Sequence, residues 1–82
     1  MWYVYLLRCS DGSLYCGVAK DVLKRLAQHN TGTGSKYVRS KRPAVLVWYT
    51  FRHDKSAALK REAEVKRMTR AKKLALVAGG AM

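Results

Sequence analysis

The five acidic side chains are the natural candidates for a metal site, because carboxylates are ligands that hard divalent cations prefer. Asp11 lies in a Ser-Asp-Gly-Ser turn sequence, and Asp21 and Asp54 precede apolar-periodic segments. A short carboxylate at such a position binds free backbone N–H groups in a turn or at the start of a helix. Glu62 and Glu64 therefore remain as candidate metal ligands.

Glu62 is the unusual member of this pair. At about 100° per residue, Glu62 falls near the centre of the apolar arc of its helix, whereas Glu64 points to the opposite side and pairs with Lys60. The arc consists of Ala58, Leu59, Ala63 and Val65. A carboxylate directed at the protein's own body is costly unless it is paired or bound to a cation. A pair with Arg or Lys and a bound metal ion both satisfy this requirement.

Four further side chains have the chemistry to act on a phosphodiester. The planar donor fork of Arg25 suits charge on phosphate oxygens, and the imidazole of His29 can carry a proton near neutral pH. Tyr5 and Tyr15, two tyrosines near Gly17, are further candidates for a catalytic role. Each also has an ordinary explanation, as a packing tyrosine, a surface cation or a hydrogen-bonded histidine.

The two tyrosines belong to a predicted β-hairpin. Residues 2–9 and 14–19 are rich in β-branched and aromatic residues and flank the turn sequence. A two-residue turn would put Tyr5 and Tyr15 on opposite faces, whereas a three-residue loop with Gly12 in the left-handed conformation puts them on one face. We favour the loop, because it separates an aliphatic face from a tyrosine-bearing face. These faces are Val4, Leu6, Leu14, Cys16 and Val18, and Tyr3, Tyr5, Leu7, Tyr15 and Gly17.

Arg25 and His29 belong to a predicted helix over residues 22–30, with Asp21 as its N-cap and Asn30 or Gly32 at its end. Its apolar stripe consists of Val22, Leu23, Leu26 and Ala27. At helical spacing, Arg25 and His29 lie one turn apart on the edge of this stripe. We therefore expect both at the boundary between core and solvent.

A basic loop over residues 31–43 follows, and then a run without charge at 44–51, which predicts a strand that is well covered. Helices are expected at about 57–68, opened by Asp54 or Ser56, and at 69–77, as a second helix or a bent extension.

The predicted order is ββαβαα. The expected fold is α+β, a three-stranded antiparallel sheet flanked by helices, and residues 1–82 are expected to form one domain.

The charge balance points to a polyanionic partner. Seventeen Lys and Arg against five Asp and Glu give a formal charge of +12, which favours nucleic acid. The expected backbone contacts are Lys36, Arg39, Lys41 and Arg42 in the loop, and Lys66, Arg67, Arg70, Lys72 and Lys73 on the last helices.

No apolar run is long enough for a membrane span, and Cys9 and Cys16 have neither zinc-site spacing nor an expected disulfide. We therefore expect a cytoplasmic protein.

Taken in order, the candidate residues resemble the pattern of the GIY-YIG endonuclease superfamily, particularly its small single-domain bacterial proteins, the UPF0213-like branch. The resemblance is carried by Tyr3-Val4-Tyr5, Tyr15-Cys16-Gly17, Lys24-Arg25, His29 and Glu62. Tyr3 stands in place of the first glycine of the namesake motif, and Cys16 in place of its second isoleucine. A late Asn found near the site in some members has no counterpart, because Asn30 is the only Asn.

The resemblance implies hydrolysis of phosphodiester bonds in DNA with Mg²⁺ or Mn²⁺ held by Glu62. In this scheme Arg25 stabilises transition-state charge, one of Tyr5 and Tyr15 is the base, and His29 positions water or phosphate. A non-catalytic module that binds DNA or RNA is the alternative, and an accessory subunit is a third. The base, the preferred nucleic-acid structure and the oligomeric state stay open.

Overall fold

The computed structural model describes residues 1–31 and 41–79. Its elements are β1 (Trp2–Arg8), β2 (Leu14–Ala19), α1 (Val22–Thr31), β3 (Val45–Arg52), α3 (Lys55–Lys66) and α4 (Arg70–Gly79). The strands form one antiparallel sheet in the order β2-β1-β3. The predicted ββαβαα order and the α+β class are confirmed.

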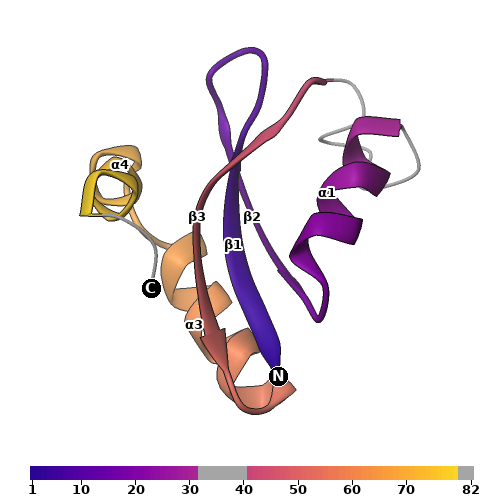
Figure 1. Cartoon of the computed structure of the whole chain (residues 1–82). Helices are drawn as coiled ribbons and strands as arrows, with labels where there is room; N and C mark the ends of the chain where they lie inside the picture. Colours follow the sequence, from indigo (N-terminus) through magenta and orange to yellow (C-terminus); the bar gives the residue numbers. More distant parts are fainter. Residues whose placement is uncertain (32–40, 80–82) are drawn as a thin grey trace.

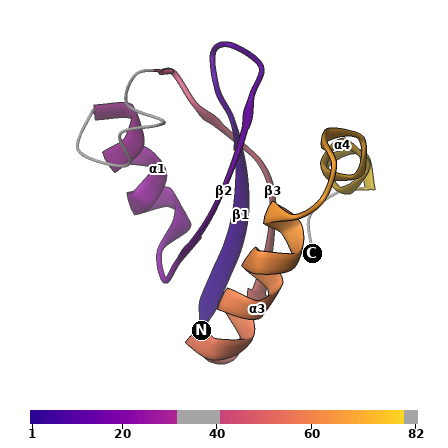
Figure 2. The same ribbon diagram turned by 180° about the vertical axis from the view of Figure 1, so that it is seen from behind.

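The sheet separates two hydrophobic clusters. Helix α1 lies on one side of the sheet, and α3 and α4 lie on the other, as both views show (Figures 1 and 2). The α1 side buries Tyr5, Leu7, Cys9 and Ala44, with Tyr15, Val22, Leu26 and Leu46 packed against them. The α3 side buries Val4, Leu6, Cys16, Trp48, Ala58 and Val65. The predicted division of the hairpin into an aliphatic and a tyrosine-bearing face is therefore confirmed.

The hairpin has the three-residue loop. Leu7 pairs with Tyr15, and the φ of Gly12 is 85°, in the left-handed region that favours glycine. The carboxylate of Asp11 accepts hydrogen bonds from the Ser13 backbone N–H at 3.0 Å and the Ser13 hydroxyl at 2.6 Å. These bonds, and then the Lys41 ammonium, hold the pKa of Asp11 well below its usual range. The loop fixes the register that brings both tyrosines to one face.

Asp21 caps α1, since its carboxylate accepts the Lys24 backbone N–H at 3.0 Å. The predicted apolar stripe is partly wrong, because Leu23 and Ala27 are exposed. The side of α1 nearer the protein is instead made of Val22, Arg25, Leu26 and His29. This set follows the i, i+3, i+4, i+7 spacing of one helix face. The helix is thus turned so that its two candidate catalytic residues face the sheet.

The prediction of a strand over 44–51 is confirmed, but the expectation that it is well covered is wrong. β3 is an edge strand, and Val45, Tyr49 and Phe51 are exposed on it. Helix α1 packs over β2, at the other edge of the sheet. An uncharged, aromatic run is therefore compatible with a strand that one helix leaves partly open.

The last two helices are separate. Asp54 caps α3 by accepting the Ala57 backbone N–H at 2.8 Å, so α3 begins at Lys55, two residues before the expected start. Thr69 caps α4, since its hydroxyl accepts the Lys72 backbone N–H at 3.2 Å. None of the helices within 1–31 and 41–79 has the length and apolar character to cross a membrane.

Candidate functional site

Tyr5 and His29 form the centre of a polar cluster between the sheet and α1. The Tyr5 hydroxyl lies 3.2 Å from Nε2 of His29, and the two side chains come from β1 and α1. Tyr5 is 2% exposed and His29 is 0% exposed. The expected position of His29 at the boundary between core and solvent is therefore wrong, since the helix carries it fully inside.

Gly17 makes room for this pair. It lies opposite Tyr5 in the β1–β2 register, and a Cβ added to Gly17 would come 2.5 Å from the Tyr5 hydroxyl oxygen. No side chain fits at that distance, so the tyrosine can lie across β2 only above a glycine. Glycine at the end of the Tyr15-Cys16-Gly17 triplet is thus explained by the close approach of Tyr5.

Tyr15 and Arg25 form the more exposed side of the cluster, and both are half-buried. The ring of Tyr15 packs edge-on to the His29 imidazole, with centroids 5.4 Å apart. The guanidinium of Arg25 donates from Nη1 to Oε1 of Gln28 at 3.1 Å. The structure therefore brings four of the five predicted site residues together.

Burial sets the protonation of the cluster. Burial first, and then the charge that Tyr15 would carry, raise the pKa of Tyr5 to about 12, although Arg25 opposes the rise. Burial and the Arg25 charge lower the pKa of His29 below 6.5. At neutral pH the Tyr5 hydroxyl is thus protonated and the His29 imidazole is neutral.

Glu62, the fifth predicted residue, lies on α3 and so on the other side of the sheet. Its side chain is 18% exposed, and one carboxylate oxygen lies 3.6 Å from Nζ of Lys66. Burial and then the Glu62 charge raise the pKa of the Cys16 thiol to about 11. The Glu62 carboxylate therefore lies close to β2 on the α3 side of the sheet. Glu62 and the tyrosine cluster approach one strand, β2, from its two faces.

The arc predicted around Glu62 is correct only in part. Ala58 and Val65 are buried, whereas Leu59 and Ala63 are exposed, because the packed face of α3 follows positions 58, 61, 62 and 65.

Glu64 is exposed as expected, but its ion-pair partner is Arg61 at 3.3 Å rather than Lys60.

The residues around Glu62 suit a metal that needs few protein ligands. Within the described part of the chain, no group of three or more His, Cys, Asp or Glu side chains could hold an ion. Mg²⁺ commonly takes one or two carboxylates and completes its shell with water and substrate phosphates. One half-buried carboxylate beside a surface lysine fits that mode, with Lys66 as a competitor for the same oxygens.

The predicted DNA-contacting cations lie on both sides of the sheet. Lys36 and Arg39 lie outside the described residues. Lys41 pairs with Asp11 at 2.9 Å, and Arg42 donates to the Asn30 carbonyl at 3.3 Å, which places both near the hairpin loop and the end of α1. Lys66 is exposed on α3, Arg70 and Lys72 are exposed on α4, and Arg67 is exposed at the C-cap of α3, while Lys73 is half-buried. The described cations thus form no single stripe.

Two positioning residues were missed in the sequence. Gln28 orients Arg25, and Asn30 clamps the end of α1 to the start of β3 by accepting the Ala44 N–H at 2.8 Å and donating to the Ala44 carbonyl at 3.0 Å. The spacing of Gln28 from Arg25, three residues along a helix, is a signal for the first contact. The second joins distant segments and leaves no local signal.

The chain is similar to known proteins over almost its whole length. Residues 1–75 match the model of the GIY-YIG catalytic domain. A UPF0213 protein of Staphylococcus saprophyticus is 50% identical over 78 residues, which is 95% of each chain. A UPF0213 protein of Staphylococcus aureus is 53% identical over 75 residues, which is 92% of each chain.

Two solved structures share the fold. The solution NMR structure of a UPF0213 protein from Bacillus halodurans is 43% identical, with a TM-score of 0.61, over 95% of this chain and 84% of that one. The solution NMR structure of a protein from E. faecalis is 40% identical, with a TM-score of 0.59, over 87% and 76%. With its tyrosine hairpin, its Arg and His on α1 and its matched length, the chain belongs to the GIY-YIG family, among relatives of the UPF0213 type.

Proposed function

We propose that this protein is a metal-dependent endonuclease that hydrolyses phosphodiester bonds in DNA. The observation that carries the proposal is the hydrogen bond between Tyr5 and His29 with Arg25 and Tyr15 beside it. A proton acceptor, a hydroxyl relay and a phosphate-binding cation are the parts that acid–base attack on a phosphodiester requires. Membership of the GIY-YIG family supports the same reaction.

Attack on phosphorus requires a water to lose a proton while the bond from phosphorus to the leaving oxygen breaks. Arg25 binds a non-bridging phosphate oxygen and stabilises the charge that develops there. Tyr15 is the more exposed tyrosine and holds the water. Tyr5 is protonated at neutral pH, so it can take up the proton only by passing its own to the neutral His29.

Glu62 is the proposed ligand of Mg²⁺ or Mn²⁺. When bound, the cation would polarise a phosphate oxygen and stabilise the leaving oxygen. Tyr15 lies on β2 with its side chain on the α1 side of the sheet, and Glu62 lies on α3, which packs on the other side of β2. Because β2 is an edge strand, we place the scissile phosphate at this edge of the sheet.

The proposed backbone contacts in the described part of the chain are Lys41 and Arg42, near the hairpin loop and the end of α1, and Lys66 and Arg70 on α3 and α4. Lys36 and Arg39, outside the described residues, are proposed as further contacts. Both cysteines are buried free thiols, which suits the proposed location in the cytoplasm.

The test is Mg²⁺- or Mn²⁺-dependent cleavage of plasmid and branched DNA by matched variants. Arg25→Ala and Glu62→Gln should each lower the single-turnover rate by about 100-fold or more, because each removes transition-state charge stabilisation. Arg8→Ala and Glu64→Gln are the controls, since both residues are exposed and lie outside the cluster. Rates within about threefold of wild type for both site variants would refute this site.

A non-catalytic module that binds DNA or RNA is the second candidate, and the burial of Tyr5 and His29 favours it. Fully buried rings can be retained for packing alone. Under this alternative, wild type cleaves none of the substrates at any divalent-ion concentration while it still binds them tightly.

A further inference from the structure

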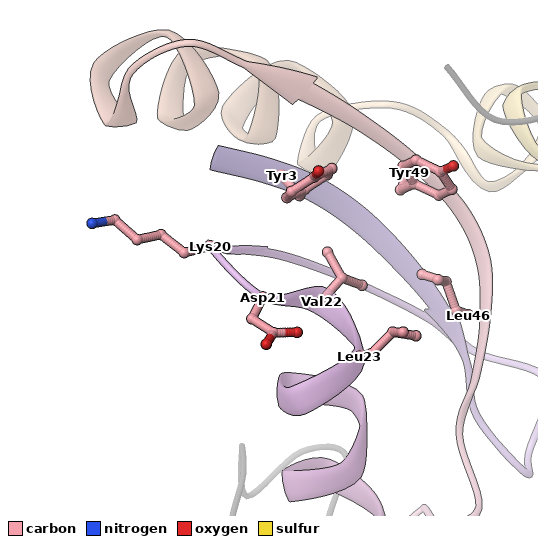
Figure 3. Close-up of a pocket in the computed structure, with 7 residues that line it drawn as sticks. All are labelled: Tyr3, Lys20, Asp21, Val22, Leu23, Leu46 and Tyr49. Carbon is pink, nitrogen blue, oxygen red and sulfur yellow. The ribbon is translucent and has the colours of Figure 1, made fainter. Parts of the chain in front are cut away.

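An open cavity lies beside the tyrosine cluster. It has a volume of about 450 Å³, within the range of pockets that hold small ligands. Figure 3 shows Tyr3 and Tyr49 on the sheet facing Val22 and Leu23 at the start of α1, with Leu46 at one end. The Lys20 side chain runs outward from the rim, and its ammonium lies 5.1 Å from the centre of the Trp2 ring.

Three aromatic rings stand on this part of the sheet, and we refer to Tyr3, Tyr49 and Phe51 as the aromatic face. The Tyr3 ring lies 6.1 Å from the Tyr49 ring and 6.2 Å from the Phe51 ring. Tyr49 is 40% exposed and Phe51 is 42% exposed. Because α1 packs over β2, the rings on β3 keep apolar surface in contact with water.

The aromatic face continues directly from the proposed site. Tyr49 is the register partner of Tyr5 across β1 and β3, and Tyr3 lies two residues from Tyr5 on the same face of β1. Residues directly opposite in a sheet have Cβ atoms roughly 5 Å apart. Helix α1 also borders both places, with Val22 and Leu23 at the cavity and Arg25 and His29 at the cluster.

We propose that the aromatic face and its cavity bind an unpaired nucleobase of the strand whose phosphate Arg25 holds. Every base offers a π-face to aromatic side chains, whereas a base inside a duplex is already stacked. The chain's charge of +12 attracts the strand, and the one acidic residue at the cavity, Asp21, is engaged in capping α1. This inference rests on the proposed function for the position of the scissile phosphate.

The test measures binding without divalent metal, so that it does not depend on cleavage. A labelled single-stranded oligonucleotide is titrated with wild type, Tyr49→Ala and Tyr49→Phe at fixed salt. Tyr49→Ala should weaken binding by about 5- to 100-fold, the usual effect of losing one stacked base, whereas Tyr49→Phe keeps the ring and should bind as wild type does. Leu59→Ala is the control, as an exposed apolar residue on α3.

A second arm identifies the base itself. Removing one base from the oligonucleotide, position by position, should reveal a position where wild type loses affinity and Tyr49→Ala loses no more, because the same contact is already gone. Fully paired DNA of the same sequence should show little response to Tyr49→Ala.

Equal weakening of single-stranded and paired DNA by Tyr49→Ala, or a change below about twofold for both, would overturn the inference. If wild type is a dimer and Tyr49→Ala is a monomer, the aromatic face is an interface between two copies of the chain, and the inference of a base site is overturned. If wild type does not cleave DNA but its binding still depends on the Tyr49 ring, the proposed nuclease activity is refuted and the proposed base site is retained.

Discussion

The Tyr5–His29 pair combines two requirements that oppose each other. Burial keeps the imidazole neutral and able to accept a proton, yet the same burial raises the pKa of Tyr5 to about 12 and makes it a poor base alone. The 3.2 Å contact between Tyr5 and His29 resolves this, since a proton can pass along it. The pair, rather than either residue, is the proposed proton acceptor.

Protonation of His29 should cost stability on the acid side. Its pKa is lowered in the folded protein, so the unfolded chain binds the proton first as pH falls below 6.5. The free energy of unfolding should therefore decrease as pH falls below about 6.5, and His29→Gln should lack this part of the decrease. Thermal unfolding of both proteins at several pH values measures it. Parallel pH dependences in the two proteins would show that His29 is not held neutral.

Gly17 should tolerate no side chain. In Gly17→Ala the new Cβ meets the Tyr5 hydroxyl at 2.5 Å, so we expect a loss of about 1–3 kcal/mol in the free energy of unfolding, as for other overpacked sites. Denaturant unfolding gives the value. Adding Tyr5→Phe removes the nearest clashing atom and should recover part of the loss.

Gly79→Ala is the matched control for this change, since nothing lies within 4 Å of a Cβ at Gly79. Equal stability of Gly17→Ala and wild type would mean that Tyr5 does not lie across Gly17.

Among single residues, the sequence was most informative where chemistry and local geometry coincide. Tyr5 and Tyr15 could be placed on one face because the hairpin loop sets the register, and Asp21 and Asp54 could be placed as caps. The clamp from Asn30 to Ala44 could not be predicted, because it joins segments that approach only in the folded chain.

Among the elements, α1 and β3 show how packing overrides a pattern. The predicted stripe of α1 counted Leu23 and Ala27 as core, but the helix packs through Val22 and Leu26 and turns Arg25 and His29 inward. The hydrogen bond between Tyr5 and His29 stabilises this orientation, and no apolar residue in the sequence signals it. Counting apolar residues alone therefore assigns the wrong inner face to a helix when that face is partly polar.

The prediction for β3 was wrong because an uncharged sequence does not show how far a neighbouring helix extends. The sequence indicated a strand that is well covered, yet one helix spans only part of a three-stranded sheet, and the rings of Tyr49 and Phe51 are left exposed. Such exposure on an edge strand is unusual unless the surface has a partner. The unpaired nucleobase proposed above would be this partner.

At the scale of the whole molecule, the sheet divides the predicted site. Helix α1 brings Arg25 and His29 to one face, and α3 brings Glu62 to the other (Figure 1). The order of motifs along the chain could not reveal this separation, because it depends on which side of the sheet each connection takes. β2 is an edge strand that contacts both α1 and α3, so a phosphate at this edge can meet groups from both sides of the sheet.

The net charge predicts strong salt dependence. A protein that neutralises several phosphates releases counterions, so the logarithm of the binding constant should fall linearly with the logarithm of salt concentration. Arg70→Ala should reduce the slope by about one if Arg70, exposed on α4, contacts one phosphate. Titrations at several salt concentrations measure both. A flat salt response would contradict a nucleic-acid partner.

The central claim is that the Tyr5 hydroxyl takes part in cleavage, and Tyr5→Phe tests it most directly. The substitution removes one oxygen and keeps the ring that packs on Gly17 and His29. Single-turnover cleavage of DNA with Mg²⁺ should slow by about 100-fold or more, as for loss of a general acid–base group, while the fold is retained. A folded Tyr5→Phe protein that cleaves at the wild-type rate would contradict the claim.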